Sequence, residues 1–134
     1  MVLTTNGTKM TFREILYNNK GKTIFIDIWA SWCKDCIIGF KNINKLQEEF
    51  PEVAFVYLSV DRGSVAWKRG IEKYNLIGQH YNLPKGQNDG DFVNFIDLWW
   101  IPRYMIIDKK GNIALYKATK VTDDRILEIL RKTK

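Results

Sequence analysis

Apolar positions along the chain follow two patterns, one typical of buried strands and one of a helix with a single buried face. Residues 23–29 and 53–60 are nearly continuous runs rich in β-branched and aromatic residues, which predicts two buried strands. Between them, apolar side chains in residues 33–50 recur every three or four positions, which predicts a helix. These positions are Cys36, Phe40, Ile43, Leu46 and Phe50. A strand, a helix and a strand in this order predict a parallel, right-handed crossover.

Shorter patterns predict the remaining elements of an α/β fold. Thr11 and Glu14 have the spacing of a capping box, so a short helix is expected over residues 11–17. Ser64 and Thr122 are expected to cap two further helices, one over residues 64–74 and one at the C-terminus. The other expected elements are a short added strand at 79–83, an exposed loop at 84–91, a helix at 92–99, and two strands at 104–108 and 113–118 around a turn.

Composition limits the number of domains and the class of partner. A chain of 134 residues, 46% hydrophobic and 27% charged, is expected to form a single domain over residues 1–134. The formal charge of +6 comes from dispersed basic residues, which indicates a solvated surface and no nucleic-acid partner. Asp27 interrupts the longest apolar run, so no membrane span is expected. The N-terminus lacks the pattern of a secretory signal, which leaves a cytoplasmic protein or a domain trimmed from a longer chain.

Two cysteines, Cys33 and Cys36, lie where the first buried strand gives way to the long helix. Unpaired N–H groups and the positive end of the helix dipole favour an anion there, so a thiol at Cys33 loses its proton readily. Two intervening residues place the cysteines one helical turn apart, within reach of a reversible disulfide. A zinc site needs about four ligands, and the chain offers only these cysteines and His80. We therefore expect redox chemistry and no metal.

The segment Ile26-Asp27-Ile28-Trp29-Ala30-Ser31-Trp32-Cys33-Lys34-Asp35-Cys36 and the later pair Ile101-Pro102 resemble the thioredoxin superfamily. The residues inserted between positions 60 and 102 are similar to those of its TlpA/ResA-like (AhpC/TSA-type) branch, the exported bacterial thiol-disulfide oxidoreductases. The resemblance implies a three-layer α/β/α sandwich with a mixed central sheet, helices on both faces, and a TlpA-like insertion before a cis-proline at Pro102. It also implies no cofactor beyond the redox-active Cys33–Cys36 disulfide, a monomer, and a periplasmic or cell-envelope location.

Asp27 is a carboxylate in the middle of an apolar strand and, by the resemblance, occupies the place of thioredoxin's buried aspartate. Burial raises the pKa of a carboxyl group, and an acid that titrates near neutral pH is a suitable proton donor and acceptor for Cys36. The alternative is that Asp27 lies at a solvent-exposed edge of the sheet.

Lys34 and Asp35, between the two cysteines, depart from the family pattern. Lys34 would stabilise a thiolate and Asp35 would oppose it at similar range, so their direct effects on the redox potential partly cancel. TlpA/ResA relatives also tend to carry a glutamate and a proline at the positions of Gly39 and Lys41. Asp27 is therefore the only evident buried acid.

Aromatic and apolar residues flank the cysteines and the proline. Trp32, Trp100, Ile101 and Pro102 are expected to bind an extended substrate chain, with hydrogen bonds to the backbone of the residue before the proline. Trp29 and Trp99 have an alternative place in the core. His80 is expected at the surface or in a strand.

Together these features predict a thiol-disulfide oxidoreductase that exchanges disulfides with protein substrates and acts as a reductase. Its partners would be protein thiols and disulfides and an upstream electron donor or acceptor. Cys33 should face solvent and attack first, and Cys36 should be buried and resolve the mixed disulfide. The competing hypothesis is a redox-inactive binding module, which an intact cysteine pair disfavours. Peroxide reduction would need a peroxidatic cysteine with its own threonine and arginine, which the sequence does not show.

Overall fold

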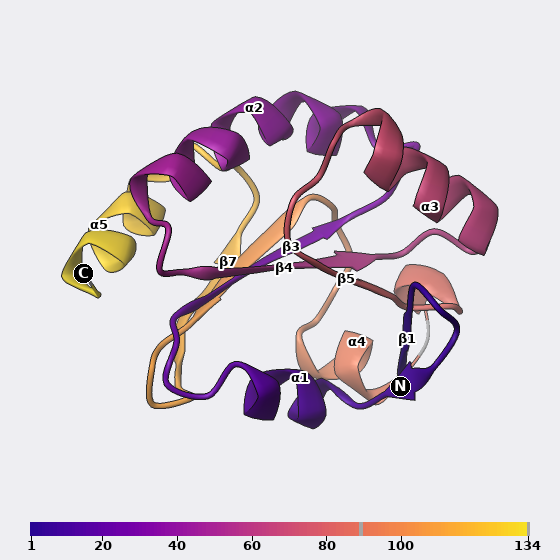
Figure 1. The fold of residues 1–134 in the computed structure, drawn as a ribbon, viewed down its shortest axis with the longest axis horizontal. Helices are drawn as coiled ribbons and strands as arrows, with labels where there is room; N and C mark the ends of the chain where they lie inside the picture. Colours follow the sequence, from indigo (N-terminus) through magenta and orange to yellow (C-terminus); the bar gives the residue numbers. More distant parts are fainter. Residues whose placement is uncertain (89, 134) are drawn as a thin grey trace.

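A seven-stranded mixed sheet forms the middle layer of the computed structural model, which describes residues 1–88 and 90–133 (Figure 1). The strands are β1 (Val2–Thr4), β2 (Lys9–Met10), β3 (Ile24–Trp29), β4 (Ala54–Ser59), β5 (Gln79–Asn82), β6 (Arg103–Ile107) and β7 (Ile113–Ala118). Their order across the sheet is β2-β1-β5-β4-β3-β6-β7. Strands β3, β4 and β5 are parallel, whereas β6 is antiparallel to β3 and β7, and β1 is antiparallel to β2 and β5. The expected mixed sheet is confirmed.

Helices cover both faces of this sheet. They are α1 (Phe12–Asn18), α2 (Lys34–Glu49), α3 (Ser64–Lys73), α4 (Asp91–Phe95) and α5 (Asp124–Lys132), and a 3₁₀ turn, η1 (Gly86–Asn88), precedes α4. In Figure 1, α2 and α3 lie on one side of the sheet and α1 and α4 on the other, while α5 contacts β7. The three-layer α/β/α sandwich is therefore confirmed. None of the described helices is long and apolar enough to cross a membrane.

The core is centred on β3 and β4, in which every residue is buried. Each of these strands has a hydrogen-bonded neighbour on both sides and helices over both faces, which explains their continuous apolar runs. Helix α2 buries the predicted stripe, and Phe50 at its C-terminal cap is buried as well.

The capping box of α1 is also confirmed, since the Thr11 hydroxyl accepts the Glu14 N–H and Glu14 Oε1 accepts the Thr11 N–H.

The residues between β4 and β6 form the expected insertion. Helix α3 returns the chain to the sheet as β5, which pairs in parallel with β4, so the added strand is confirmed. The loop expected at 84–91 is only partly exposed, because it contains η1, in which Gly86 is buried. Residue 89 of this loop lies outside the described residues.

Two predicted helix caps are wrong by one residue. Gly63, not Ser64, is the N-cap of α3, and Ser64 is the first helical residue, with no side-chain cap. Asp123, not Thr122, caps α5, because its carboxylate accepts the Arg125 N–H at 3.0 Å. Ser, Thr, Asp and Gly are all acceptable N-cap residues, so the tertiary path of the chain decided among neighbours.

Helix α4 begins one residue before, and ends four residues before, the limits predicted for it. Asp97 adopts the left-handed conformation, with φ of 53°, which ends a helix. The N–H of Leu98 donates to the Val93 carbonyl at 3.1 Å and that of Asp97 to the Asn94 carbonyl at 3.2 Å, the two bonds of a Schellman motif. Trp99 and Trp100 consequently lie in a loop and not on a helix.

Candidate active site

Cys33 and Cys36 form a disulfide at the N-terminus of α2, with their Cα atoms 5.3 Å apart. Cys33 is the N-cap residue, and its Sγ accepts the backbone N–H of Cys36 at 3.2 Å. Cys33 is 6% exposed and Cys36 is 0% exposed. Cys33 is thus less accessible than the sequence suggested, because it packs into the core cluster, but of the two residues it alone has a solvent-accessible surface.

A buried carboxylate, Asp61, holds the loop that leads into the cysteines. Its oxygens accept the Ser31 N–H at 3.1 and 3.2 Å and the hydroxyls of Ser31 and Ser59 at 2.7 Å each. The amide of Asn82 donates to the Asp61 backbone carbonyl at 2.8 Å. Sequence reasoning missed Asp61. The available signal was an acid just after a buried strand, where the carboxyl ends of parallel strands meet.

Asp27 lies in β3, between β4 and β6, and is 2% exposed, so the alternative of an exposed sheet edge is wrong. Neither carboxylate oxygen has a hydrogen-bond partner among the described residues. Removal from water disfavours the charged form and raises the pKa of Asp27 to about 8. A carboxyl group with this pKa changes charge near neutral pH.

Two tyrosines flank Asp27 in the sheet. Asp27 is in register with Tyr57 on β4 and Tyr104 on β6, so the three side chains form a row on one face. Burial and, secondarily, the charge of Asp27 raise the pKa of both phenols above the ordinary value. The Tyr104 hydroxyl also lies 2.7 Å from the point that a Cβ atom on Gly39 of α2 would occupy. This contact explains why position 39 has no side chain, and sequence reasoning missed the tyrosine.

A groove of about 610 Å³ opens beside the cysteine motif. Its wall includes Asp35, Ile38, Gly39, Trp99, Trp100 and Pro102. The peptide bond between Ile101 and Pro102 is cis, as expected. The groove thus lies between the start of α2, the loop before β6 and residues 119–122 after β7.

The four residues expected to bind substrate are placed differently from one another. Trp100 and Pro102 line the groove. Trp32 is 63% exposed but does not line it, and the side chain of Ile101 is buried. Trp99, which had an alternative place in the core, is 65% exposed, whereas Trp29 is fully buried.

The remaining candidate residues, Lys34, Asp35 and His80, differ in exposure and in their contacts. Lys34 and Asp35 are both exposed, and only Asp35 lines the groove. His80 lies half-buried in β5, where its ring stacks on Tyr57 with centroids 4.8 Å apart and its Nε2 contacts the Leu76 carbonyl. Within residues 1–88 and 90–133, no three His, Cys, Asp or Glu side chains are grouped closely enough to hold a metal ion.

Comparisons with known proteins agree with this geometry. The family model described as Thioredoxin-like matches residues 21–113. Thiol-disulfide oxidoreductase ResA of Bacillus thuringiensis subsp. konkukian is 26% identical over 128 residues, which cover 94% of this chain and 69% of that protein. Thiol:disulfide interchange protein DsbE of Yersinia pestis is 26% identical over 103 residues, which cover 77% of this chain and 52% of that protein.

Solved structures show the same fold. The thioredoxin domain of a thiol-disulfide oxidoreductase from Bacteroides vulgatus superposes with a TM-score of 0.80 at 20% identity, covering 98% of this chain and 91% of that one. The family model covers the cysteine pair, the cis-proline and the four strands from β3 to β6, so the chain belongs to the Thioredoxin-like family.

Proposed function

We propose that this protein is a thiol-disulfide oxidoreductase that exchanges disulfides with protein substrates through Cys33 and Cys36. The observation that carries the proposal is the Cys33–Cys36 disulfide at the N-terminus of α2, in which Cys33 is 6% exposed and Cys36 is fully buried. The names of the relatives, ResA and DsbE among them, support the same activity.

The geometry favours Cys33 as the attacking residue. The helix N-terminus and the N–H of Cys36 stabilise a thiolate at Cys33. In the reducing direction, the Cys33 thiolate attacks one sulfur of a substrate disulfide, forms a mixed disulfide, and releases the other substrate sulfur as a thiolate that takes up a proton. The Cys36 thiolate then attacks Cys33 Sγ, which closes the ring and releases the second substrate thiol. Two electrons pass from the enzyme dithiol to the substrate.

Asp27 is proposed to accept the Cys36 proton before this second attack. Asp27 and Tyr104 share one face of the sheet, and Tyr104 meets α2 at Gly39, so the carboxyl group lies on the face that α2 covers. Its pKa of about 8 allows it to gain and lose a proton near neutral pH. Cys36 is the cysteine buried on that side of α2.

The groove is proposed to hold an extended segment of the substrate. Trp100 and Pro102 supply apolar surface in it, Trp32 lies next to Cys33 in the chain, and the Ile101 backbone is without a hydrogen-bonded partner in the described part of the chain. Such a backbone is available to pair with a peptide. Lys34 and Asp35 are proposed to tune the redox potential, because both lie between the two cysteines.

We further propose that the protein acts as a reductase outside the cytoplasm and receives electrons from an upstream donor. The support is its similarity to ResA and DsbE. Both sulfurs come from one chain, so a monomer is sufficient for the reaction. Equilibration of the protein with dithiothreitol buffers would test the direction, because a reductase should have a potential near or below about −200 mV.

Trapping of the mixed disulfide tests the proposed activity and the order of attack. With reduced Cys36→Ser and insulin as the disulfide probe, we expect a covalent insulin adduct at Cys33, because no second thiol can release it. With Cys33→Ser, we expect little adduct and loss of exchange. Mass spectrometry under non-reducing conditions measures both. Adduct formation mainly through Cys36 would overturn the order, and absence of exchange by the unmodified protein would support the redox-inactive binding module.

A further inference from the structure

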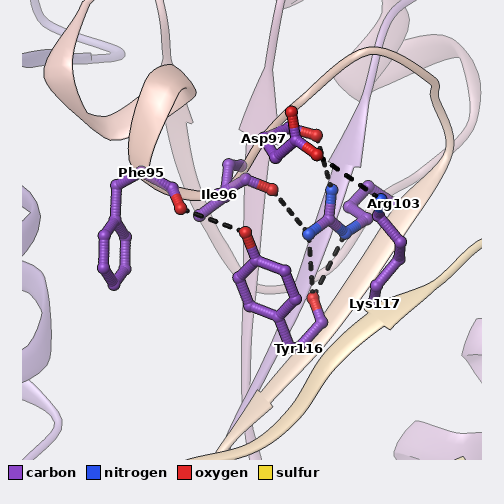
Figure 2. Close-up of polar contacts among 6 residues, drawn as sticks. All are labelled: Phe95, Ile96, Asp97, Arg103, Tyr116 and Lys117. Carbon is purple, nitrogen blue, oxygen red and sulfur yellow. Dashed lines mark hydrogen bonds and ion pairs between the residues drawn. The ribbon is translucent and has the colours of Figure 1, made fainter.

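Arg103, the first residue of β6, is a buried cation with no carboxylate partner among the described residues. It is 1% exposed, although charged side chains are rarely buried unless they are paired. Its guanidinium donates to carbonyl oxygens instead, as Figure 2 shows: to Ile96 at 2.7 Å, to Tyr116 at 3.1 and 3.2 Å, and to Asp97 at 3.4 Å. The guanidinium carbon also lies 4.9 Å from the centroid of the Tyr116 ring. Main-chain carbonyls and one aromatic ring therefore satisfy the charge.

Two of these carbonyls belong to the C-terminal end of α4. The Schellman motif already satisfies the carbonyls of Val93 and Asn94. The next carbonyl, that of Phe95, accepts the Tyr116 hydroxyl at 3.0 Å, and Arg103 binds the two that follow (Figure 2). A cation is also favourable at the negative end of a helix. Strands β6 and β7 thus complete the cap that the helix cannot supply for itself.

The loop of residues 98–102 runs from this cap to Arg103. Arg103 therefore holds the loop at both ends, through the carbonyls of Ile96 and Asp97 before it and through its own place in β6 after it. The loop carries Trp99, Trp100 and Pro102 into the groove beside the cysteine motif. The two indoles are 65% and 51% exposed, and burial in the core therefore does not fix them. Lys117 on β7 contacts the same loop. Its ammonium lies 3.9 Å from the Asp97 carboxylate, as drawn in Figure 2, and 5.1 Å from the Trp99 ring centroid.

We propose that Arg103 is a positioning residue for substrate binding: by holding the carbonyls of Ile96, Asp97 and Tyr116, it sets the tryptophan-bearing wall of the groove. The inference rests on the proposed function, because it requires that a polypeptide substrate occupies the groove. The proposal predicts different effects on two activities of the protein, exchange with small disulfides and exchange with protein disulfides. Exchange with a small disulfide does not need the wall of the groove, whereas exchange with a protein disulfide does.

Two measurements test this separation: steady-state reduction of a protein disulfide, with dithiothreitol regenerating the enzyme dithiol, and single-turnover oxidation of the pre-reduced protein by a small disulfide. Insulin is the protein disulfide, and 5,5′-dithiobis(2-nitrobenzoic acid) is the small one. For Arg103→Lys and Arg103→Met, we expect KM for insulin to rise about tenfold with kcat within about twofold, because uniform binding is lost. The rate with the small disulfide and the reduction potential should stay unchanged. Lys109→Met is the matched control, since Lys109 is an exposed cation in the turn after β6, and it should behave as the unmodified protein.

Two further variants separate positioning from folding. In a Trp99→Ala/Trp100→Ala background, Arg103→Lys should raise KM for insulin no further, because the wall is already absent. If Arg103→Met fails to fold, Tyr116→Phe replaces it. That variant loses only the hydroxyl bond to the Phe95 carbonyl and keeps the Tyr116 carbonyl that Arg103 binds. It should raise KM for insulin about two- to threefold.

Distinct outcomes overturn the inference and the proposed function. An unchanged KM for insulin in Arg103→Lys, an equal loss with both probes, or a further rise in the double-alanine background each overturns the positioning role. If the unmodified protein exchanges with neither probe, the proposed function fails and the inference fails with it. If it exchanges with both and the Arg103 variants match it, only the inference fails.

Discussion

At the scale of single residues, burial of Asp27 links the stability of the fold to pH. Its pKa is about 8 in the folded protein and near the ordinary value of 3.8 in the unfolded chain. Between these values the unfolded chain releases a proton that the folded protein keeps. The unfolded state then binds fewer protons, so the free energy of unfolding falls as pH rises through this window and stays low above pH 8.

We therefore expect Asp27→Asn to become more stable relative to the unmodified protein as pH rises from 4 to 8. The shift corresponds to a gain of roughly 5 kcal/mol over this pH range, whereas burial of the amide adds a cost that does not change with pH. Urea unfolding of both proteins at several pH values measures the difference, in which contributions from other groups cancel. Asp35→Asn, a change at an exposed carboxylate, is the control and should give a constant difference. If the free energies of unfolding of Asp27→Asn and the unmodified protein depend on pH in the same way, the raised pKa of Asp27 is contradicted.

The same variant tests the proposed role of Asp27 in catalysis. Without the carboxyl group, release of oxidised enzyme from the mixed disulfide should slow most at pH 6.5. Above pH 8, hydroxide and buffer bases take over part of the proton transfer, so the loss should be smaller. Rapid quenching followed by mass spectrometry measures the mixed disulfide directly. A loss at pH 8.5 as large as that at pH 6.5 would remove the acid–base role.

At the scale of elements, α2 approaches the sheet at one glycine. A Cβ atom at Gly39 would lie 2.7 Å from the Tyr104 hydroxyl oxygen but 4.0 Å from the ring carbon that carries it. The hydroxyl alone therefore keeps position 39 free of a side chain. Because glycine costs a helix interior about 1 kcal/mol relative to alanine, this close packing is maintained against helix propensity.

A double-mutant cycle measures this packing. In the unmodified protein, Gly39→Ala should destabilise by about 1 to 3 kcal/mol, since the buried tyrosine has little room to move. In a Tyr104→Phe background, the same change should be neutral or stabilise by up to about 1 kcal/mol. Denaturant unfolding of the four proteins gives the coupling. Equal effects of Gly39→Ala in both backgrounds would show that the hydroxyl is not the obstacle.

For the whole molecule, we expect local stability to be high at the centre of the sheet and low at its β2 edge. Strand β3 is paired on both sides and buried throughout, whereas β2 has two residues, one neighbour and an exposed Lys9. Regions with few buried contacts open locally, while central strands exchange only through global unfolding. The short loop between β3 and α2 that leads into Cys33 is attached to this stable centre. It follows β3 directly, and Asp61 after β4 binds its Ser31.

Amide hydrogen exchange should reveal this gradient. We expect hydrogen-bonded amides of β3 to exchange at least about 100-fold more slowly than those of β2. Strand β7 is the control: it is also an edge, but it has six residues and contacts α5, so its amides should exchange at intermediate rates. Two-dimensional NMR after transfer to deuterated water measures the rates. Comparable protection of β2 and β3 would contradict this order.

Features that rest on short-range periodicity and capping can be predicted from the sequence. The continuous apolar runs of β3 and β4 and the stripe of α2 identify the parallel crossover, because strand and helix bury side chains with different periods. Thr11 and Glu14 mark the start of α1 through contacts three residues apart. The cysteine pair could be placed at a strand–helix junction for the same reason. Asp27 was evident because a charge interrupts a regular apolar run.

Features that depend on partners far apart in sequence become visible in the folded protein and cannot be predicted from local patterns. Arg103 precedes the strand that the sequence predicts at 104–108, and its role emerges only when α4 and β7 bring their carbonyls to it. Asp61 meets Ser31 because two parallel strands end at one edge, and Gly39 is explained by a hydroxyl from another strand. The N-terminal hairpin of β1 and β2 is too short to produce a periodic pattern. In each case local sequence allows several conformations of similar free energy, and long-range hydrogen bonds and packing select one of them.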